Sequence, residues 1–187
     1  DQMIWSNGPF IGPAIGGLQM SAVSTSANDA SGGTGLRTVE VHYLDTDLVQ
    51  QVETITLNGT SPVTMSATDV YFINELHVLT FGSNKKAAGD ITVYNGSDVY
   101  AEILTGENTQ FSSAKMVPKG KVFYLAGAIA GSSSSNSDSR VTVKLVANRY
   151  NGITFADPFV FIPYGLVELQ DSTVTYNFPI PSAFPAG

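Results

Sequence analysis

The stretch that decides the fold is Arg37-Thr-Val-Glu-Val-His-Tyr-Leu-Asp-Thr-Asp-Leu-Val-Gln-Gln-Val-Glu-Thr-Ile-Thr-Leu57, in which two β-like segments flank an acidic turn. In the first segment Val39, Val41 and Tyr43 alternate with polar residues, which is typical of a strand that buries one face. We therefore predict an antiparallel hairpin over residues 37–57, whose first strand points these three side chains into a core. The turn over residues 44–47 is expected in solvent or at a subunit contact.

The second half of this hairpin changes its apolar face part-way along the strand. Ile55 and Leu57 share one face with Glu53, whereas Val52 lies on the other. One extra residue in a strand moves the following side chains to the opposite face, so we predict a β-bulge near Val52.

The rest of the chain contains further short β-like segments and no helical period longer than two turns. The predicted strands are residues 18–24, 70–81, 90–94, 99–104, 111–117, 121–130, 141–147, 153–161 and 166–178. Many short strands with frequent turn signals predict an all-β fold, an antiparallel β-sandwich or jelly roll with extended N- and C-terminal arms.

Turn residues separate these segments. The dipeptide Asn-Gly occurs at residues 58–59, 95–96 and 151–152, each time between β-like segments. Both residues tolerate positive φ, so we predict a hairpin tip at each of the three. The Pro-Lys-Gly sequence at residues 118–120 is predicted to close another hairpin between the strands that flank it.

Both ends of the chain are apolar, yet their glycines or prolines suit neither helices nor central strands. We predict an N-terminal arm over residues 1–17, a β-sandwich domain over 18–177 and a Pro-rich tail over 178–187. The arms are expected to lie along neighbouring subunits. For residues 1–17, an edge strand and loop of the same domain is an equal alternative. The predicted interface residues are Trp5, Phe10, Ile11, Phe178, Ile180 and Phe184.

Charge and composition exclude several partners. The formal net charge is −7 with only nine lysines and arginines, so we expect no nucleic-acid binding, which needs clustered basic residues. No apolar run approaches the roughly 20 residues of a membrane helix, and no membrane partner is expected. The chain has no cysteine, which excludes disulfides and thiolate chemistry.

The sequence contains few residue patterns that are typical of catalytic or metal-binding sites. His42 and His77 each lie within a predicted strand, and neither has a second histidine at metal-ligand spacing. No Gly-x-Ser-x-Gly motif supports a hydrolase triad. The acidic residues that offer calcium hard oxygen ligands are Asp29, Asp45, Asp47, Glu53 and Asp90. Because aspartate also caps turns, we favour the turn interpretation. We therefore predict no enzyme activity, no catalytic residue, no cofactor and no obligatory metal.

Six segments together resemble a family of tailed-bacteriophage proteins that is common in aquatic phages and mostly described as hypothetical or structural. They are Val23-Ser-Thr-Ser-Ala-Asn-Asp29, Gly33-Thr-Gly-Leu-Arg-Thr-Val39, Tyr43-Leu-Asp-Thr-Asp47, Glu53-Thr-Ile-Thr-Leu-Asn-Gly-Thr60, Ala88-Gly-Asp-Ile-Thr92 and Val117-Pro-Lys-Gly-Lys121. The order and spacing of these segments, over roughly residues 20–125, carry the resemblance. In the last segment the family usually has alanine in the middle, which leaves the turn intact.

This resemblance implies a virion component rather than an enzyme, and it carries over no catalytic or ligand residue. We expect a minor or decoration protein of the capsid that forms a homo-oligomer, a trimer, and contacts the major capsid protein or other virion proteins. A tail, adaptor or fibre component is the alternative within the virion. Outside that class, a carbohydrate-binding adhesin comes next and a hydrolase last. The aromatic residues that would form a sugar platform are Trp5, Tyr94, Tyr100, Tyr124, Tyr150 and Tyr164.

Overall fold

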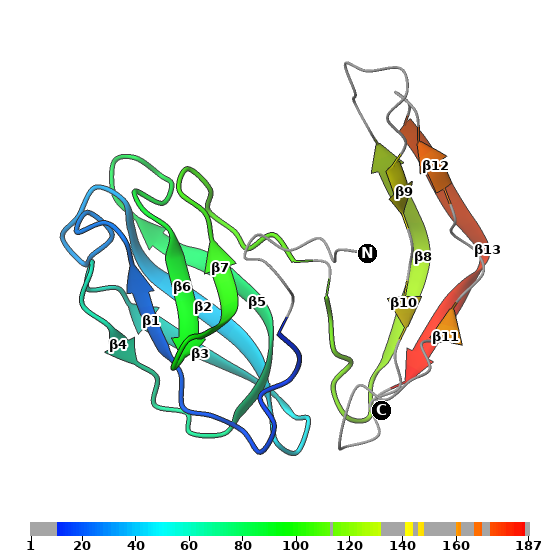
Figure 1. Ribbon diagram of the computed structural model, residues 1–187, viewed down its shortest axis with the longest axis horizontal. Helices are drawn as coiled ribbons and strands as arrows, with labels where there is room; N and C mark the ends of the chain where they lie inside the picture. The colour runs from blue at the N-terminus through cyan, green and yellow to red at the C-terminus, as the bar shows by residue number, and fades with distance from the viewer. Residues whose placement is uncertain are drawn as a thin grey trace. The chain divides into compact units, whose positions relative to one another are not determined.

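The chain folds into two compact units, residues 1–118 and 119–187, in a computed structural model (Figure 1). The structure describes residues 11–112, 114–131, 141–143, 146–147, 160–161, 167–169 and 173–185. Every regular element among them is a β-strand. The division differs from the single sandwich domain predicted over residues 18–177, because the strands after Pro118 pair with one another and form a unit of their own.

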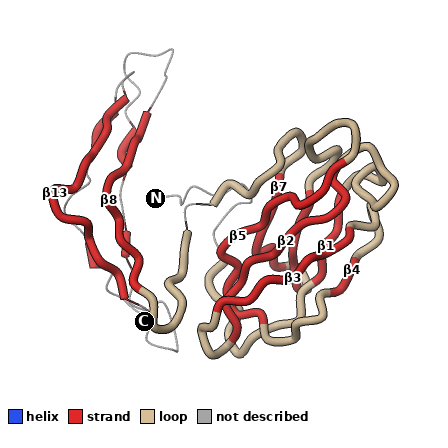
Figure 2. The backbone as a smooth tube through the Cα atoms, turned by 180° about the vertical axis from the view of Figure 1, so that it is seen from behind, coloured by secondary structure: helices blue, strands red, loops and turns tan. Residues whose placement is uncertain are grey.

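The first unit is a β-sandwich of two antiparallel sheets (Figures 1 and 2). One sheet has the order β3-β2-β5, with β2 at Leu36–Asp45, β3 at Gln50–Thr56 and β5 at Val70–Phe81. The other has the order β4-β1-β6-β7, with β1 at Ser21–Ser24, β4 at Val63–Thr64, β6 at Ile91–Asn95 and β7 at Asp98–Ile103. The predicted all-β sandwich is confirmed, and the jelly-roll order stays a prediction.

The predicted hairpin over residues 37–57 is confirmed as β2 and β3. The two strands pair in unbroken antiparallel register, from Thr38 opposite Thr56 to Leu44 opposite Gln50. Val39, Val41 and Tyr43 are buried, as their alternation with polar residues predicts, because successive side chains of a strand point to opposite faces of the sheet.

The bulge predicted near Val52 is wrong. Val52 lies directly opposite His42 within the regular ladder and is exposed on the outer face. The sequence of β3 suggested a change of apolar face only because Val52 is an apolar residue on the solvent-exposed face. The register of this sheet is irregular on its other side, where β5 pairs with β2 with four register shifts. At one of them Asn74 is inserted between the partners of His42 and Tyr43.

The turn after β2 is also more buried than predicted. Leu44 is fully buried and Asp45 is buried, so only the tip of the turn reaches solvent. Asp45 Oδ1 accepts hydrogen bonds from the backbone N–H groups of Asp47 at 3.0 Å and Val49 at 2.9 Å. Leu48 adopts a positive φ of 61° in this turn. The favoured turn role of Asp45 is thus confirmed.

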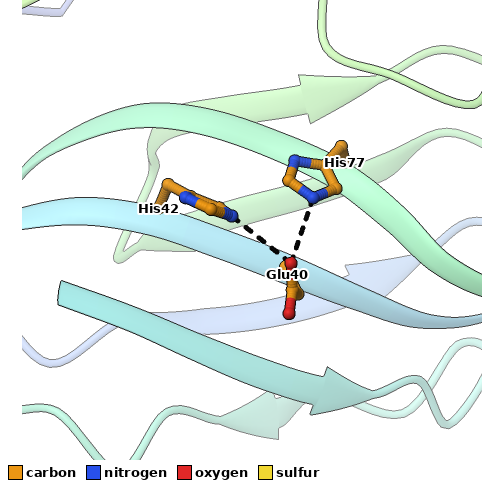
Figure 3. Close-up of side chains that lie close together, drawn as sticks. All are labelled: Glu40, His42 and His77. Atoms are coloured by element: carbon orange, nitrogen blue, oxygen red, sulfur yellow. Dashed lines mark hydrogen bonds and ion pairs between the residues drawn. The ribbon is translucent and has the colours of Figure 1, made fainter.

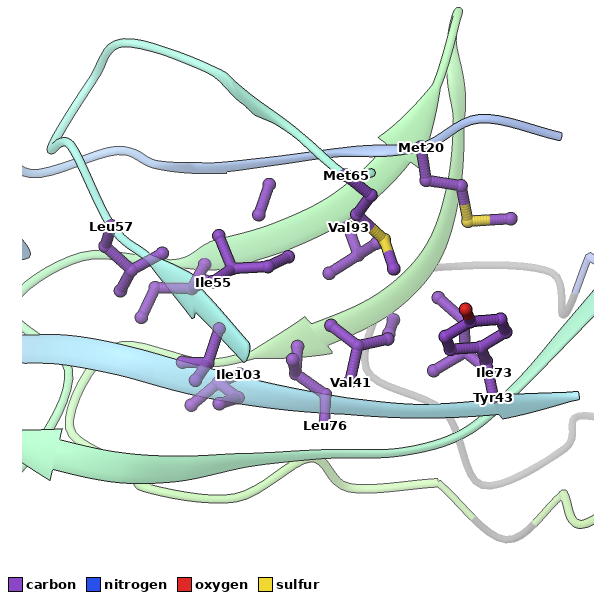
Figure 4. Close-up of a cluster of buried hydrophobic side chains, with 14 of the residues drawn as sticks. Met20, Val41, Tyr43, Ile55, Leu57, Met65, Ile73, Leu76, Val93 and Ile103 are labelled. Carbon is purple, nitrogen blue, oxygen red and sulfur yellow. The ribbon is translucent and has the colours of Figure 1, made fainter. Parts of the chain in front are cut away.

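The core fills the space between the two sheets (Figure 4). Side chains from β2, β3 and β5 face side chains from the opposite sheet and from the segments that precede β1 and follow β4. The labelled members are Met20, Val41, Tyr43, Ile55, Leu57, Met65, Ile73, Leu76, Val93 and Ile103. Burial of each large aliphatic side chain contributes about 1.5–3 kcal/mol, which is why the alternating strands hold this arrangement.

Other predicted elements have mixed outcomes. Residues 70–81 form β5 as predicted, and β6 and β7 form a hairpin around Gly96, which has a φ of 60°. Gly59 also has a positive φ, but residues 58–59 are no hairpin tip, because β3 pairs with β2 whereas β4 pairs with β1. The third predicted tip, at residues 151–152, lies outside the described residues.

The hairpin predicted between residues 111–117 and 121–130 is wrong. The second segment forms β8, at Val122–Gly131, which pairs with β13, at Thr173–Pro185. The described residues of the first segment form no strand, and Gly120, with a φ of 72°, turns the chain just before β8. A sequence turn signal shows that the chain bends there, but it does not show which strand β8 will pair with.

The predicted C-terminal tail, residues 178–187, is largely a strand. The β8–β13 register passes from Asn177 opposite Gly127 to Ser182 opposite Leu125, so Pro179 and Pro181 fall within the interruption. Proline cannot donate to a ladder and is tolerated at such irregular positions. The remaining pairs of the second unit join β9, at Val141–Val143, to β12, at Val167–Leu169, and β10, at Val146–Ala147, to β11, at Val160–Phe161.

Two glycines with open space around them provide a test of the turn geometry. A Cβ atom added at Gly96 or Gly32 meets nothing within 4 Å, but only Gly96 has a positive φ. We expect Gly96→Ala to destabilise the first unit by about 1 kcal/mol through left-handed strain. Gly32→Ala should be neutral or stabilising by up to about 1 kcal/mol. Urea denaturation compares them, and equal effects would contradict the assigned hairpin turn.

Candidate functional site

A cluster of one glutamate and two histidines lies on the outer face of sheet β3-β2-β5 (Figure 3). Glu40 and His42 belong to β2 and point away from the core because they alternate with Val39 and Val41. His77 reaches the same face from β5, where it pairs directly with Glu40. The ladder between β2 and β5 therefore brings together residues that are far apart in the sequence.

The two imidazole rings converge on one oxygen atom. Nε2 of His77 lies 3.1 Å from Oε2 of Glu40, and Nε2 of His42 lies 3.4 Å from the same oxygen. The ring centroids of the two histidines are 4.7 Å apart, with an angle of 37° between the planes. The side chains of His42, Glu40 and His77 are 21%, 25% and 36% exposed, so the cluster is half-buried but open to solvent.

A polar hollow of about 200 Å³ adjoins this cluster along β5. Its lining includes Asn74, Glu75, His77, Thr109, Gln110 and Lys115. Lys115 Nζ donates to Glu75 Oε1 at 2.9 Å and to the backbone oxygen of Asn74 at 2.6 Å. The hydrogen bond from Lys115 lowers the pKa of Glu75 below its ordinary value, although partial burial opposes the shift.

Asn74 holds one wall of the hollow in place. Its side chain donates to the backbone oxygen of Met116 at 3.0 Å and accepts from the backbone N–H of Met116 at 2.8 Å. This pair of bonds mimics a strand pairing. Because Asn74 is one of the residues inserted in β5, the bulge turns its amide toward the segment that follows the sandwich.

Chemically, the cluster offers two imidazoles and a carboxylate around one point. This set can bind a transition-metal ion, since neutral imidazole and carboxylate are common ligands of zinc. It is the only group of three or more potential ligand side chains that the described residues bring together. The prediction from sequence missed it because linear spacing does not reveal partners on neighbouring strands.

A second polar centre lies inside the first unit, at Asp29, which is 0% exposed. Asp29 Oδ1 accepts hydrogen bonds from the backbone N–H groups of Leu36 at 2.7 Å and Ala88 at 3.0 Å. Oδ2 accepts from Ser24 Oγ at 2.7 Å and from the backbone N–H of Gly89 at 2.9 Å. With four donors around it, this carboxylate ties its own loop, between β1 and β2, to the loop that precedes β6.

The predicted calcium ligands do not come together. Among the described residues, Asp29 and Asp45 are occupied by the hydrogen bonds given above. Glu53 accepts from the backbone N–H groups of Ser66 at 2.6 Å and Ala67 at 3.1 Å.

Asp90 caps the turn after β7. It accepts hydrogen bonds from the backbone N–H of Thr105 at 2.8 Å and from its hydroxyl at 2.7 Å. These bonds, the backbone one first, lower the pKa of Asp90 below its ordinary value. Its carboxylate thus has the same local role as that of Asp45.

The predicted interface residues fall in three places. Trp5 and Phe10 lie outside the described residues, whereas Ile11 is half-buried. The other three, Phe178, Ile180 and Phe184, are part of β13. Their role in subunit contacts stays a prediction.

The end of the N-terminal arm lies on its own domain, which was the equal alternative. Ala14 is buried in the core, and its backbone N–H donates to the oxygen of Tyr71 at 2.8 Å. Gly17 follows with a positive φ of 73°, and a Cβ there would lie 2.8 Å from the Cα of Asp69. Only glycine allows the chain to pass this close before β1.

The predicted sugar platform is not assembled by the residues that the structure describes. Tyr94 and Tyr100 are half-buried, and Tyr100 packs against the core. Burial, followed by the nearby charge of Asp98, raises the pKa of Tyr100. Tyr124 is exposed in the second unit. The other three aromatic candidates, Trp5, Tyr150 and Tyr164, lie outside the described residues.

Comparison of the chain with protein-family models, with curated proteins and with solved structures finds no match. Within the described part of the chain, no helix could span a membrane.

Proposed function

We propose that the chain is a structural protein of a bacteriophage virion, a minor or decoration protein of the capsid that assembles as a homo-oligomer. Its work is to bind neighbouring virion proteins, not to catalyse a reaction. The sandwich provides a rigid body, and the second unit and the terminal segments provide contacts with other chains.

One observation carries the proposal: hydrogen bonds of Asp29 join four of the six segments that resemble the phage family. Asp29 belongs to the first of these segments, Leu36 to the second and Gly59 to the fourth, while Ala88 and Gly89 belong to the fifth. Asp29 binds all of them, since its backbone oxygen also accepts from Gly59 N–H at 2.7 Å. The resemblance therefore covers residues that together hold one end of the sandwich, which supports a shared fold rather than a chance likeness of turns.

The second unit supports the assembly part of the proposal. At the start of β8, Val122, Phe123 and Tyr124 are 45%, 45% and 64% exposed. Three consecutive large apolar side chains on a surface favour a role in protein contacts. A two-stranded ribbon such as β8–β13 is also marginally stable by itself, so cover from another chain would stabilise it.

Sedimentation-velocity ultracentrifugation of the full recombinant chain at micromolar concentration tests this assembly. We expect a homo-oligomer, with a trimer as the main species. The double substitution Val122→Ser and Tyr124→Ser should shift the population toward monomer by at least tenfold in dissociation constant, whereas Lys121→Ser at the exposed neighbouring position should not. A chain that stays monomeric at micromolar concentration, alone and with its capsid protein, would contradict the proposal.

A further inference from the structure

We propose that Glu40, His42 and His77 form a binding site for one divalent transition-metal ion of the zinc class on the outer face of sheet β3-β2-β5. Each residue contributes one ligand atom: Oε2 of Glu40 and Nε2 of each histidine. One potential ligand atom from each of the three residues lies within 4.8 Å of the other two. Water completes the coordination on the exposed side.

The distances suit such an ion. Zinc lies about 2.0–2.1 Å from histidine nitrogen and carboxylate oxygen, and a tetrahedral arrangement then separates neighbouring ligand atoms by about 3.3–3.4 Å. The carboxylate oxygen of Glu40 lies 3.1 Å and 3.4 Å from the two histidine nitrogens. Small rotations of the side chains are therefore enough to place an ion among the three atoms.

The backbone holds these side chains in place before any ion arrives. Glu40 and His77 are direct partners in the β2–β5 ladder, and His42 follows two residues later on the same face. On the opposite face, Val41 and Leu76 are buried in the core. Because the core fixes both strands, binding requires little ordering of the chain, which favours affinity.

The local charge also favours a cation. Glu75 lies opposite His42 in the ladder and carries its own negative charge close to the site. The nearby cation, Lys115, is bound to Glu75 and to the backbone of Asn74. Glu40 and Glu75 thus place negative charge beside the two histidines, whose uncharged neighbours include Val52 opposite His42 and Thr109 opposite His77.

The competing explanation is a purely hydrogen-bonded cluster, in which both imidazoles donate to Glu40. The bond from His77 at 3.1 Å is acceptable, but the contact of His42 at 3.4 Å is long for a hydrogen bond. For both histidines to donate to Oε2 of Glu40, each ring must carry a proton on Nε2. A metal ion explains why both nitrogens converge there, and the two explanations differ in what added zinc does.

Titration of the chelator-treated full chain with zinc chloride tests the site. Isothermal titration calorimetry should give one ion per chain, and zinc at 100-fold above the dissociation constant should raise the Tm of the first unit by about 5 °C or more. Glu40→Gln, His42→Asn and His77→Asn should each weaken binding by at least tenfold. Asp47→Asn is the control, because it removes an exposed carboxylate in the turn after β2, and it should change the affinity by less than about threefold.

A spectroscopic measurement separates coordination from loose surface binding. The chain has only two histidines, so its NMR spectrum contains two sets of ring-nitrogen signals, which the His42→Asn and His77→Asn variants assign. Stoichiometric zinc should shift Nε2 of both histidines together, and cobalt(II) should give the visible absorption of a tetrahedral ion. Binding that survives all three ligand substitutions, or zinc that leaves both histidine spectra unchanged, would overturn the proposal.

Discussion

Replacing Asp29 with alanine is expected to destabilise the first unit by about 3–5 kcal/mol, the largest effect of any single polar substitution in it. The substitution removes the acceptor of four hydrogen bonds and leaves buried donors without a partner. Each unsatisfied buried donor costs about 1–3 kcal/mol, and hydrogen bonds to a charged acceptor are the stronger ones. Water that enters the cavity would recover part of this loss.

Asp29→Asn keeps the size and shape of the side chain but removes its negative charge and one acceptor oxygen. The amide keeps one oxygen for Leu36 and Ala88, but its nitrogen then faces the N–H of Gly89, where two donors meet. We expect an intermediate loss of about 2 kcal/mol. Asp47→Ala, in an exposed turn, should change the stability by less than about 0.5 kcal/mol. Urea denaturation followed by circular dichroism measures all three, and a loss below about 1 kcal/mol for Asp29→Ala would contradict the role of this residue.

Replacing Leu76 with alanine is expected to cost about 2–5 kcal/mol. Leu76 is 1% exposed and packs in the core between the two sheets (Figure 4). The loss combines the transfer free energy of the removed methyl groups with the cavity they leave, and a sandwich core that is fixed from both sides collapses little.

Leu79 provides a matched control on the same strand, because it has the same side chain but is 49% exposed. Leu79→Ala should change the stability by less than about 0.5 kcal/mol. Thermal or urea unfolding of the two variants side by side measures the difference. If both substitutions cost the same, the register of β5 would be wrong, since a shift of one residue exchanges the two faces of a strand.

The sequence allowed those features to be predicted that depend on local pattern. The alternation of Val39, Val41 and Tyr43 was enough to place β2 and its buried face, and Asn95 with Gly96 was enough to place the β6–β7 hairpin. In both cases the partners are close in the sequence. The alternation of apolar and polar residues and the residue types of the turn then determine the strand pairing almost completely.

Features that depend on distant pairing could not be predicted in this way. The β8 strand follows a good turn signal, yet it pairs with β13 about fifty residues later rather than with the segment before the turn. His42 and His77 meet only because β5 lies beside β2 with a particular register. A pattern within one segment carries no information about either neighbour.

The burial of loop residues could likewise not be predicted from the sequence pattern. Asp29 stands in a stretch of Ser, Asn, Asp and Gly that is typical of an exposed loop. Its full burial follows from the hydrogen bonds that draw its own loop, the loop before β6 and Gly59 together around this residue. In the structure, Gly35 explains how Asp29 is buried, because a Cβ at this position would collide with Oδ1 of Asp29. Only a glycine at that position allows the loops to close around the carboxylate.

The copy number of the chain in purified phage particles tests the central claim most directly. Quantitative mass spectrometry against isotope-labelled peptides, with the major capsid protein as the internal standard, gives the ratio between the two proteins. A capsid decoration protein is expected at hundreds of copies per particle, in a fixed ratio to the major capsid protein. Six, twelve or a few tens of copies would assign it to the tail or a vertex, and its absence from intact particles would contradict a structural role in the virion.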